Sequence, residues 1–265
     1  MHDMPLNQAV GLLGLAAPEA PQLLAVVAHG DARSEQPLLW QLSSALSQLG
    51  YGVTVLDATM AEAAHNPGLQ QLLDYQFGHG HVEAEGPAWN VLPAATGLQS
   101  LCALGARPAH SLQRLGEVLQ TNGVIVLYAP VDGLISLLAN SEVRPLLSVS
   151  CEKSSLLTSY LALKRLLRKA RLEPTILNMI GAAQLTREGH AANVVQALSE
   201  CARNFLAYEV NAIRIDPSQP DAQLDAEMRH LATRLLENAL ALKSSTPRGG
   251  TGFEPAGIRE MSRSH

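Results

Sequence analysis

Short apolar runs and longer stretches with helical periodicity alternate along most of this chain. Runs such as Leu23–Ala28 and Val124–Tyr128 are apolar throughout instead of alternating with polar residues. This pattern is typical of parallel strands whose two faces are both covered by helices. The predicted strands are Leu23–Ala28, Val53–Leu56, Trp89–Leu92, Val124–Tyr128, Leu146–Ser150, Thr175–Met179 and Val210–Ile215.

The stretches between these runs repeat their apolar residues at helical spacing. Alternation of strands and helices over roughly 200 residues predicts an α/β fold with a doubly wound, mostly parallel sheet flanked by helices. Such folds bind ligands at the carboxyl ends of their strands, so functional residues are expected directly after them. The predicted helices are Leu38–Leu49, Pro67–Tyr75, Ala109–Thr121, Leu134–Asn140, Ser154–Arg171, Gly189–Ala207 and Asp221–Lys243.

The two ends of the chain differ from this pattern. Residues 1–20 contain a short apolar helical patch, Leu6–Leu15, followed by a Pro/Ala linker. Residues 244–265 are rich in Gly, Pro, Ser and Arg, a composition typical of disorder. We therefore predict one α/β domain over residues 21–243 with a short N-terminal helix and a C-terminal tail.

Composition narrows the class of protein. Of the 265 residues 47% are hydrophobic, which suffices for a large core, and the net charge of −5 argues against general nucleic-acid binding. Three cysteines without CxxC spacing argue against a zinc site or a disulfide framework and fit a reducing cytoplasm. The sequence has neither a membrane-spanning apolar run nor a signal-peptide pattern, so we expect a cytoplasmic protein.

A set of motifs occurs in a fixed order along the chain. In chain order they read NQAVGLL, HGDARSEQ, LSSALSQLGYGVTVLDAT, VLPAATG, VLYAPVDG, VSCEKSSLLTSYLALKRL and ILNM. This ordered set resembles the MinD/ParA group of deviant-Walker ATPases, most closely its flagellar branch FlhG, also called FleN. The resemblance spans residues 6–215 and implies a P-loop NTPase fold.

The family's phosphate loop, GKGGxGKT, falls on the HGDARSEQ segment without a gap. In a working loop, backbone N–H groups wrap the phosphates while lysine and Ser/Thr supply charge and a magnesium ligand. The resemblance puts Glu35 where the family has its phosphate-binding lysine, which reverses the local charge. The remaining matched positions, from the signature lysine to the magnesium-binding threonine, are Gly30, Asp31, Ala32, Ser34 and Gln36.

Other positions matched to catalytic residues of the family also depart from it. Asp57 is retained after the second strand, but the acid that activates water in the family falls on Thr59. The magnesium-site aspartate falls on Tyr128. Asn178 matches the asparagine that contacts the base in relatives, although an amide at a strand end also makes useful backbone hydrogen bonds.

Arg33 has two interpretations. It could replace the phosphate-binding lysine, or it could be a solvated loop arginine paired with Asp31 or Glu35, which we favour.

Three other features have an ordinary explanation beside a functional one. His79 and His81 have the spacing of metal ligands, but their glycine-rich surroundings favour a loop. Cys151 follows a strand, and a structural cysteine is favoured over a nucleophile. A basic run on the predicted helix is interpreted as a solvated face, with an acidic partner or membrane surface as the alternative: Lys164, Arg165, Arg168, Lys169 and Arg171.

The C-terminal predicted helix, Asp221–Lys243, is amphipathic. Its polar face is mixed in charge instead of basic, so packing onto the domain is favoured and membrane contact is at most peripheral. Its apolar stripe comprises Leu224, Met228, Leu231, Leu235 and Leu242.

The N-terminal motif implies a protein partner. FlhG proteins begin with a DQAxxLR helix that engages the signal-recognition-type GTPase FlhF, and the match here comprises Asn7, Gln8, Ala9 and Leu12. By that resemblance, Gln8 would orient a water molecule on the partner's nucleotide. The alternative is a short apolar helix that docks on its own domain.

Together these observations predict a catalytically inactive MinD/FlhG-like pseudo-ATPase that acts through protein contacts in flagellar placement, number control or assembly, with recruitment to the cell pole or inner membrane surface. We expect no cofactor. One alternative is an ATPase or nucleotide sensor with a remodelled phosphate loop, binding ATP and magnesium through Arg33 and Asp57. Another is an accessory protein of cellulose secretion similar to BcsQ.

Overall fold

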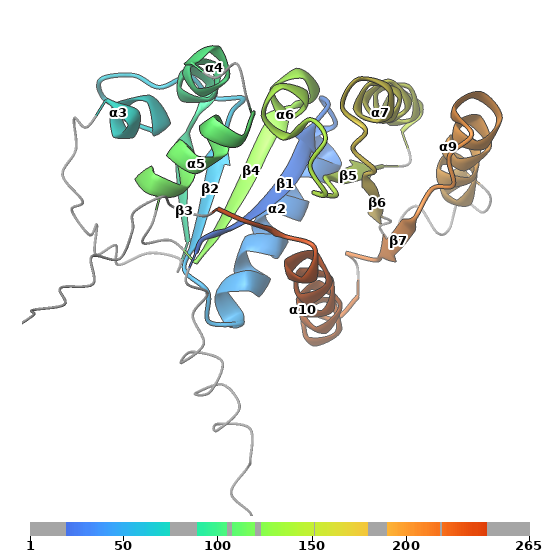
Figure 1. The fold of residues 1–265 in the computed structure, drawn as a ribbon. Helices are drawn as coiled ribbons and strands as arrows, with labels where there is room; N and C mark the ends of the chain where they lie inside the picture. Colours follow the sequence, from blue (N-terminus) through green and yellow to red (C-terminus); the bar gives the residue numbers. More distant parts are fainter. Residues whose placement is uncertain are drawn as a thin grey trace, which may run out of the picture.

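A computed structural model describes residues 20–74, 89–104, 108–119, 123–150, 152–179, 190–217 and 219–242. Its centre is a sheet with the strand order β3-β2-β4-β1-β5-β6-β7, in which all neighbouring pairs are parallel (Figure 1). A short eighth strand pairs antiparallel with the start of β1. The strands are β1 (Gln22–Ala28), β2 (Val53–Asp57), β3 (Trp89–Pro93), β4 (Val124–Pro130), β5 (Leu146–Val149), β6 (Thr175–Met179), β7 (Ala212–Ile215) and β8 (Leu240–Ala241).

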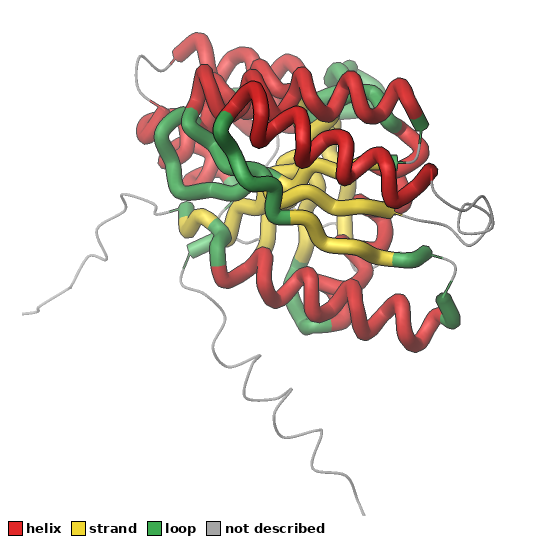
Figure 2. The backbone as a smooth tube through the Cα atoms, turned by 90° about the vertical axis from the view of Figure 1, so that its right-hand side faces the viewer, coloured by secondary structure: helices red, strands yellow, loops and turns green. Residues whose placement is uncertain are grey.

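Helices cover both faces of this sheet, as Figure 2 shows from the side. α2 and α10 lie on one face, and the other helices lie on the opposite face (Figure 1). The helices are α2 (Ala32–Gln48), α3 (Leu69–Leu73), α4 (Ala95–Leu104), α5 (Pro108–Val118), α6 (Val131–Leu138), α7 (Lys153–Arg165), which continues as the π-helical turn η1 (Leu166–Ala170), α9 (His190–Leu206) and α10 (Asp221–Glu237).

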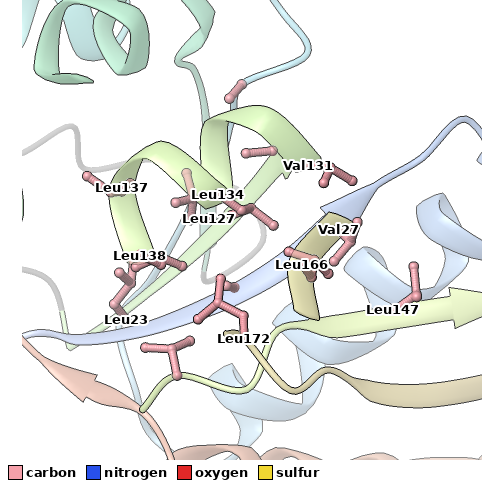
Figure 3. Packing of buried hydrophobic residues seen from close by; sticks show 14 of the residues in the cluster. Leu23, Val27, Leu127, Val131, Leu134, Leu137, Leu138, Leu147, Leu166 and Leu172 are labelled. Carbon is pink, nitrogen blue, oxygen red and sulfur yellow. The ribbon is translucent and has the colours of Figure 1, made fainter. Parts of the chain in front are cut away.

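The core consists of two aliphatic clusters, one on each face of the sheet. The central strands β1 and β4 contribute side chains to both, which is why they are apolar throughout. Figure 3 shows how α6 packs onto the sheet: Leu134 and Leu138 lie over Leu127 and Leu23. The predicted doubly wound α/β fold is confirmed, and each of the seven predicted strands lies within two residues of its expected bounds.

The helix that follows β1 begins earlier than predicted. α2 starts at Ala32 instead of Leu38, and Pro37 lies inside it. Pro37 is the sixth residue of α2, where proline removes one hydrogen bond of the helix but does not end it. The helix after β4 likewise begins directly at Val131 instead of Leu134. Both turns at the carboxyl edge of the sheet are therefore much tighter than the sequence pattern suggested.

α4 was not predicted at all. Its sequence contains Gly97, which resembles a turn signal, but here glycine is required by close packing. A Cβ atom on Gly97 would lie 2.7 Å from the side chain of Leu69 in α3. Gly97 therefore allows α4 to pack closely against α3 and does not end the helix.

The predicted C-terminal helix extends more than one turn beyond the end of the observed helix. α10 ends at Glu237, and β8 then pairs with β1. Met228 and Leu231 are buried against the α2 face, which confirms packing onto the domain. Leu242 was assigned to the same stripe but lies in the cluster on the opposite face, against Gly116 of α5.

Several other expectations concern surfaces or undescribed residues. In the basic run, Arg165 pairs with Asp132, while Arg168, Lys169 and Arg171 are exposed. Within the described ranges no helix is both long and apolar enough for a membrane span. The residues outside the described ranges include the N-terminal segment, the tail after residue 242, His79, His81 and Cys151.

Candidate functional site

The turn between β1 and α2 lies at the centre of the sheet's carboxyl edge. The chain moves to one side of β1 for β2, β3 and β4, and to the other side for β5, β6 and β7. Open α/β sheets bind their ligands at such a switch point. His29, Gly30 and Asp31 form the turn, and Gly30 has a φ of +92°, which only glycine adopts without strain.

The carboxylate of Glu35 fills this turn from within. Glu35 is only 1% exposed. Its Oε1 atom accepts hydrogen bonds from the backbone N–H groups of His29 and Asp31, both at 2.9 Å. Its Oε2 atom accepts a hydrogen bond from the hydroxyl of Tyr128. The donors that would wrap a phosphate in a working loop therefore bind a carboxylate of the same chain.

Electrostatics make this arrangement unfavourable for a second anion. Two like charges at 4 Å repel by about 4 kcal/mol at the effective dielectric constant typical of protein sites. A phosphate would also have to displace Glu35 from two N–H groups, each charge-assisted bond contributing about 1.5–3 kcal/mol. The loop thus has the backbone geometry of an anion site but already holds its anion.

Tyr128 supports Glu35 from β4. Burial raises the pKa of the Tyr128 hydroxyl, and the hydrogen bond and charge of Glu35, with the charge of Asp57, raise it further. The hydroxyl therefore stays protonated and acts as a donor. A neutral phenol that donates to a carboxylate does not replace the metal-binding aspartate to which the resemblance matches Tyr128.

His29 is a member of the site that sequence reasoning missed. Its Nε2 atom lies 2.8 Å from the carbonyl oxygen of Ser148 and 3.4 Å from Oε1 of Glu35. Because a carbonyl only accepts, Nε2 carries a hydrogen. Nδ1 lies 2.9 Å from the hydroxyl of Thr158 on α7. The available signal was the position of His29, a polar residue directly after a buried strand.

Asp31 connects the same turn to β5 and α7. Its Oδ2 atom accepts hydrogen bonds from the hydroxyl of Ser155, at 2.6 Å, and from the N–H of Ser150, at 3.2 Å. Burial alone would raise the pKa of Asp31, but the hydrogen bonds from Ser155, Ser150 and Ser34 outweigh it and lower the pKa. The Ser34 hydroxyl in turn lies 2.9 Å from the hydroxyl of Ser148. This aspartate is therefore a structural anion.

Arg33 lies on α2, not in a loop, and pairs with Glu152 instead of Asp31 or Glu35. Its side chain is 80% exposed and points away from the buried carboxylates. The predicted ion pair of Arg33 with Asp31 or Glu35 was wrong, because both carboxylates already accept hydrogen bonds in and around the turn. Gln36, matched to the magnesium-binding threonine, is also exposed.

Asp57 and Thr59 form a local turn after β2. One carboxylate oxygen of Asp57 accepts hydrogen bonds from the Thr59 N–H, at 2.8 Å, and from its hydroxyl, at 2.6 Å. This arrangement satisfies the retained acid locally. Asn178 is buried on β6, two strands from β1, so it is not part of the cluster around Glu35.

Within the described part of the chain, no group of three or more His, Cys, Asp or Glu residues is placed to hold a metal ion. The four residues matched to the nucleotide and magnesium positions do not fit those ligands. Glu35 is an anion bound within the turn, Tyr128 is a neutral donor, Thr59 bonds Asp57, and Gln36 is exposed.

No protein-family model and no curated protein sequence matches this chain. Solved structures do match its fold. Cobyrinic acid a,c-diamide synthase from Mycobacterium smegmatis, with bound ADP and magnesium, has a TM-score of 0.56 at 12% identity, covering 84% of this chain and 99% of the other. MinD of Aquifex aeolicus, in its complex with MinC, has a TM-score of 0.51 at 13% identity and covers 84% and 98%.

A plasmid partition protein from Borrelia burgdorferi has a TM-score of 0.51 at 11% identity, covering 82% of this chain and 99% of the other. At these identities the likeness is one of fold. The fold is the parallel, helix-flanked sheet of MinD/ParA-type P-loop NTPases.

Proposed function

We propose that this protein is a catalytically inactive MinD/FlhG-like pseudo-ATPase that works as a protein-interaction scaffold. The observation that carries the proposal is the buried carboxylate of Glu35, which accepts the hydrogen bonds of the turn where a phosphate would bind. The fold supports the family assignment, and the self-filled turn supports the loss of nucleotide chemistry.

Two features away from the turn support the same conclusion. Tyr128 donates to Glu35 from the position of a magnesium aspartate, and Thr59 occupies the position of the water-activating acid. The alternative, a remodelled nucleotide site, would need Arg33 and Asp57. Arg33 points to Glu152, and Asp57 bonds Thr59, so no observation favours that alternative.

The partner we propose is a protein, and FlhG resemblance suggests an FlhF-like signal-recognition-type GTPase bound through Asn7, Gln8 and Leu12. The similar Aquifex MinD is itself in complex with a protein, MinC. By the same resemblance we propose a role in flagellar placement, number or assembly at the cell pole or inner membrane surface. A cellulose-secretion role similar to that of BcsQ would share the inactive site and differ in partner.

Isothermal titration with Mg-ATP and Mg-GTP tests the inactive site. We expect no binding heat at millimolar ligand, and a Kd tighter than about 100 μM, or about 5.5 kcal/mol, would overturn the proposal. A second experiment tests the proposed partner. It measures GTP hydrolysis by an FlhF-like GTPase in the presence of the full chain or of its Gln8→Ala variant. Stimulation lost in that variant supports the flagellar assignment, and no stimulation contradicts it.

A further inference from the structure

The two tryptophans of the chain form an aromatic pair at one edge of the sheet. Trp40 on α2 and Trp89 on β3 have ring centroids 5.1 Å apart and planes at 82°, an edge-to-face contact. The sequence contains no other tryptophan. Trp40 is 60% exposed, and Trp89 is partly buried.

An exposed valine extends this pair along the edge strand. Val91 lies on the same face of β3 as Trp89, because side chains alternate along a strand, and it is 48% exposed. α2 is the helix that packs near this strand. Trp40, Trp89 and Val91 thus form an apolar surface, called here the tryptophan edge, that the described residues leave partly open.

We propose that residues 6–15 of this chain cover the tryptophan edge. Arranged as a helix, this segment would have Leu6, Val10 and Leu13 along one side and Gln8 on the other. A helix this short and carrying Gly11 and Gly14 is only marginally stable alone, so it needs an apolar surface to form.

The register of the sheet puts this surface within reach. Gln22 of β1, Val124 of β4, Val53 of β2 and Trp89 of β3 occupy one row across four neighbouring strands. Three strand spacings separate Gln22 from Trp89 by about 14 Å. The six residues 16–21 span up to about 20 Å when extended, so the linker is long enough.

The opposite face is less accessible at the same point. There the side chain of Leu242 is buried against Gly116 of α5, and a Cβ atom added to this glycine would lie 2.9 Å from the Cβ of Leu242. The N–H of Leu242 also donates to the carbonyl of Pro21 at 2.8 Å. The end of the domain thus blocks the α5 side of β1 at this point. On the other face α10 packs over β1 and α2, and Trp40, Trp89 and Val91 beyond it stay partly exposed.

Tryptophan fluorescence tests this placement directly, because both fluorophores lie in the proposed contact. Full-length protein is compared with a variant lacking residues 1–19 and with the point variants Leu13→Asp and Leu12→Asp. Leu12 is the matched control, since it lies off the stripe formed by Leu6, Val10 and Leu13. We expect deletion and Leu13→Asp to shift emission to longer wavelength and increase acrylamide quenching, with Leu12→Asp unchanged.

Three outcomes would overturn the proposal. Identical emission and quenching with and without residues 1–19 would show that this segment does not cover the edge. Equal effects of Leu12→Asp and Leu13→Asp would show that the stripe is not the contact. Quenching that depends on protein concentration, with a dimer mass in light scattering, would show that a second copy is the occupant.

Discussion

Glu35 and Glu62 use the same chemistry in two regions of this molecule. Each carboxylate accepts hydrogen bonds from backbone N–H groups at the start of a helix. Glu62, in the loop after β2, accepts from Thr96 at 2.8 Å and Gly97 at 2.7 Å in α4, and from Gln70 at 3.1 Å in α3. Glu35 accepts from the turn before its own helix.

The two carboxylates differ in their burial and in their place in the fold. Glu62 is only half-buried and joins two helices, so it is a structural cap. Glu35 is fully buried, is supported by Tyr128, and lies at the switch point where this fold binds its ligands. A capping carboxylate becomes functionally decisive only when it lies in the place of a ligand.

Removing the Glu35 carboxylate should have the largest effect. Glu35→Ala leaves the Tyr128 hydroxyl and two N–H groups unpaired in the interior, so we expect a loss of about 3–5 kcal/mol in the free energy of unfolding, measured by urea denaturation. Inorganic phosphate should restore part of that loss in the variant and have no effect on the wild type. Glu35→Gln, which keeps an acceptor, is the control; a loss under about 1 kcal/mol in Glu35→Ala would contradict the description of the turn.

Removing the tyrosine hydroxyl should have the next largest effect. Tyr128→Phe leaves one oxygen of Glu35 without a donor and should cost about 1.5–3 kcal/mol. The raised pKa of Tyr128 adds a pH signature: above pH 10.0, its ordinary value, the unfolded chain ionises while the folded chain does not, so stability falls. Urea titrations above pH 10.0 should show a shallower fall for Tyr128→Phe. Tyr208→Phe is the control, because the pKa of Tyr208 is also raised. This variant should keep the contribution of Tyr128 to the fall in stability.

Removing the helix cap should have the smallest effect. Glu62→Ala should cost about 1–2 kcal/mol, because water can reach the freed N–H groups. Burial raises the pKa of Glu62, but the N–H groups of Gly97 and Thr96 outweigh it and lower the pKa below its ordinary value of 4.5. The cap therefore stabilises the fold above pH 4.5 and loses its effect as the pH falls further. Denaturation below pH 4.5 should be less pH-dependent in Glu62→Ala, and an equal slope would rule out this cap.

The sequence was informative where the chemistry is local to a strand. Apolar runs located the strands, and the resemblance to the MinD/ParA group singled out Glu35 and Tyr128 as matches to phosphate- and magnesium-binding positions. It did not reveal that these two side chains bind each other, since 93 residues separate them. His29 and its contact with Ser148, 119 residues apart, were missed for the same reason.

The helix errors have a different cause. Gly97 and Pro37 both disfavour a helix interior on local grounds, yet Gly97 lies in α4 in close contact with Leu69, and Pro37 lies inside α2. The end of α10 was missed because pairing of β8 with β1 competes with continued helix. In α4 and at the end of α10 a tertiary contact outweighs a local preference worth about 1 kcal/mol for glycine and less for most other residues.

The hydrogen bond between Pro21 and Leu242 brings the first and last strands of the domain together. When the two ends of a domain lie side by side, a short linker can join them and new termini can be opened in another loop. Such a domain can also be inserted whole into a surface loop of another protein. The domain is thus suited to circular permutation. A new opening in the loop between α6 and β5 would preserve the turn that holds Glu35.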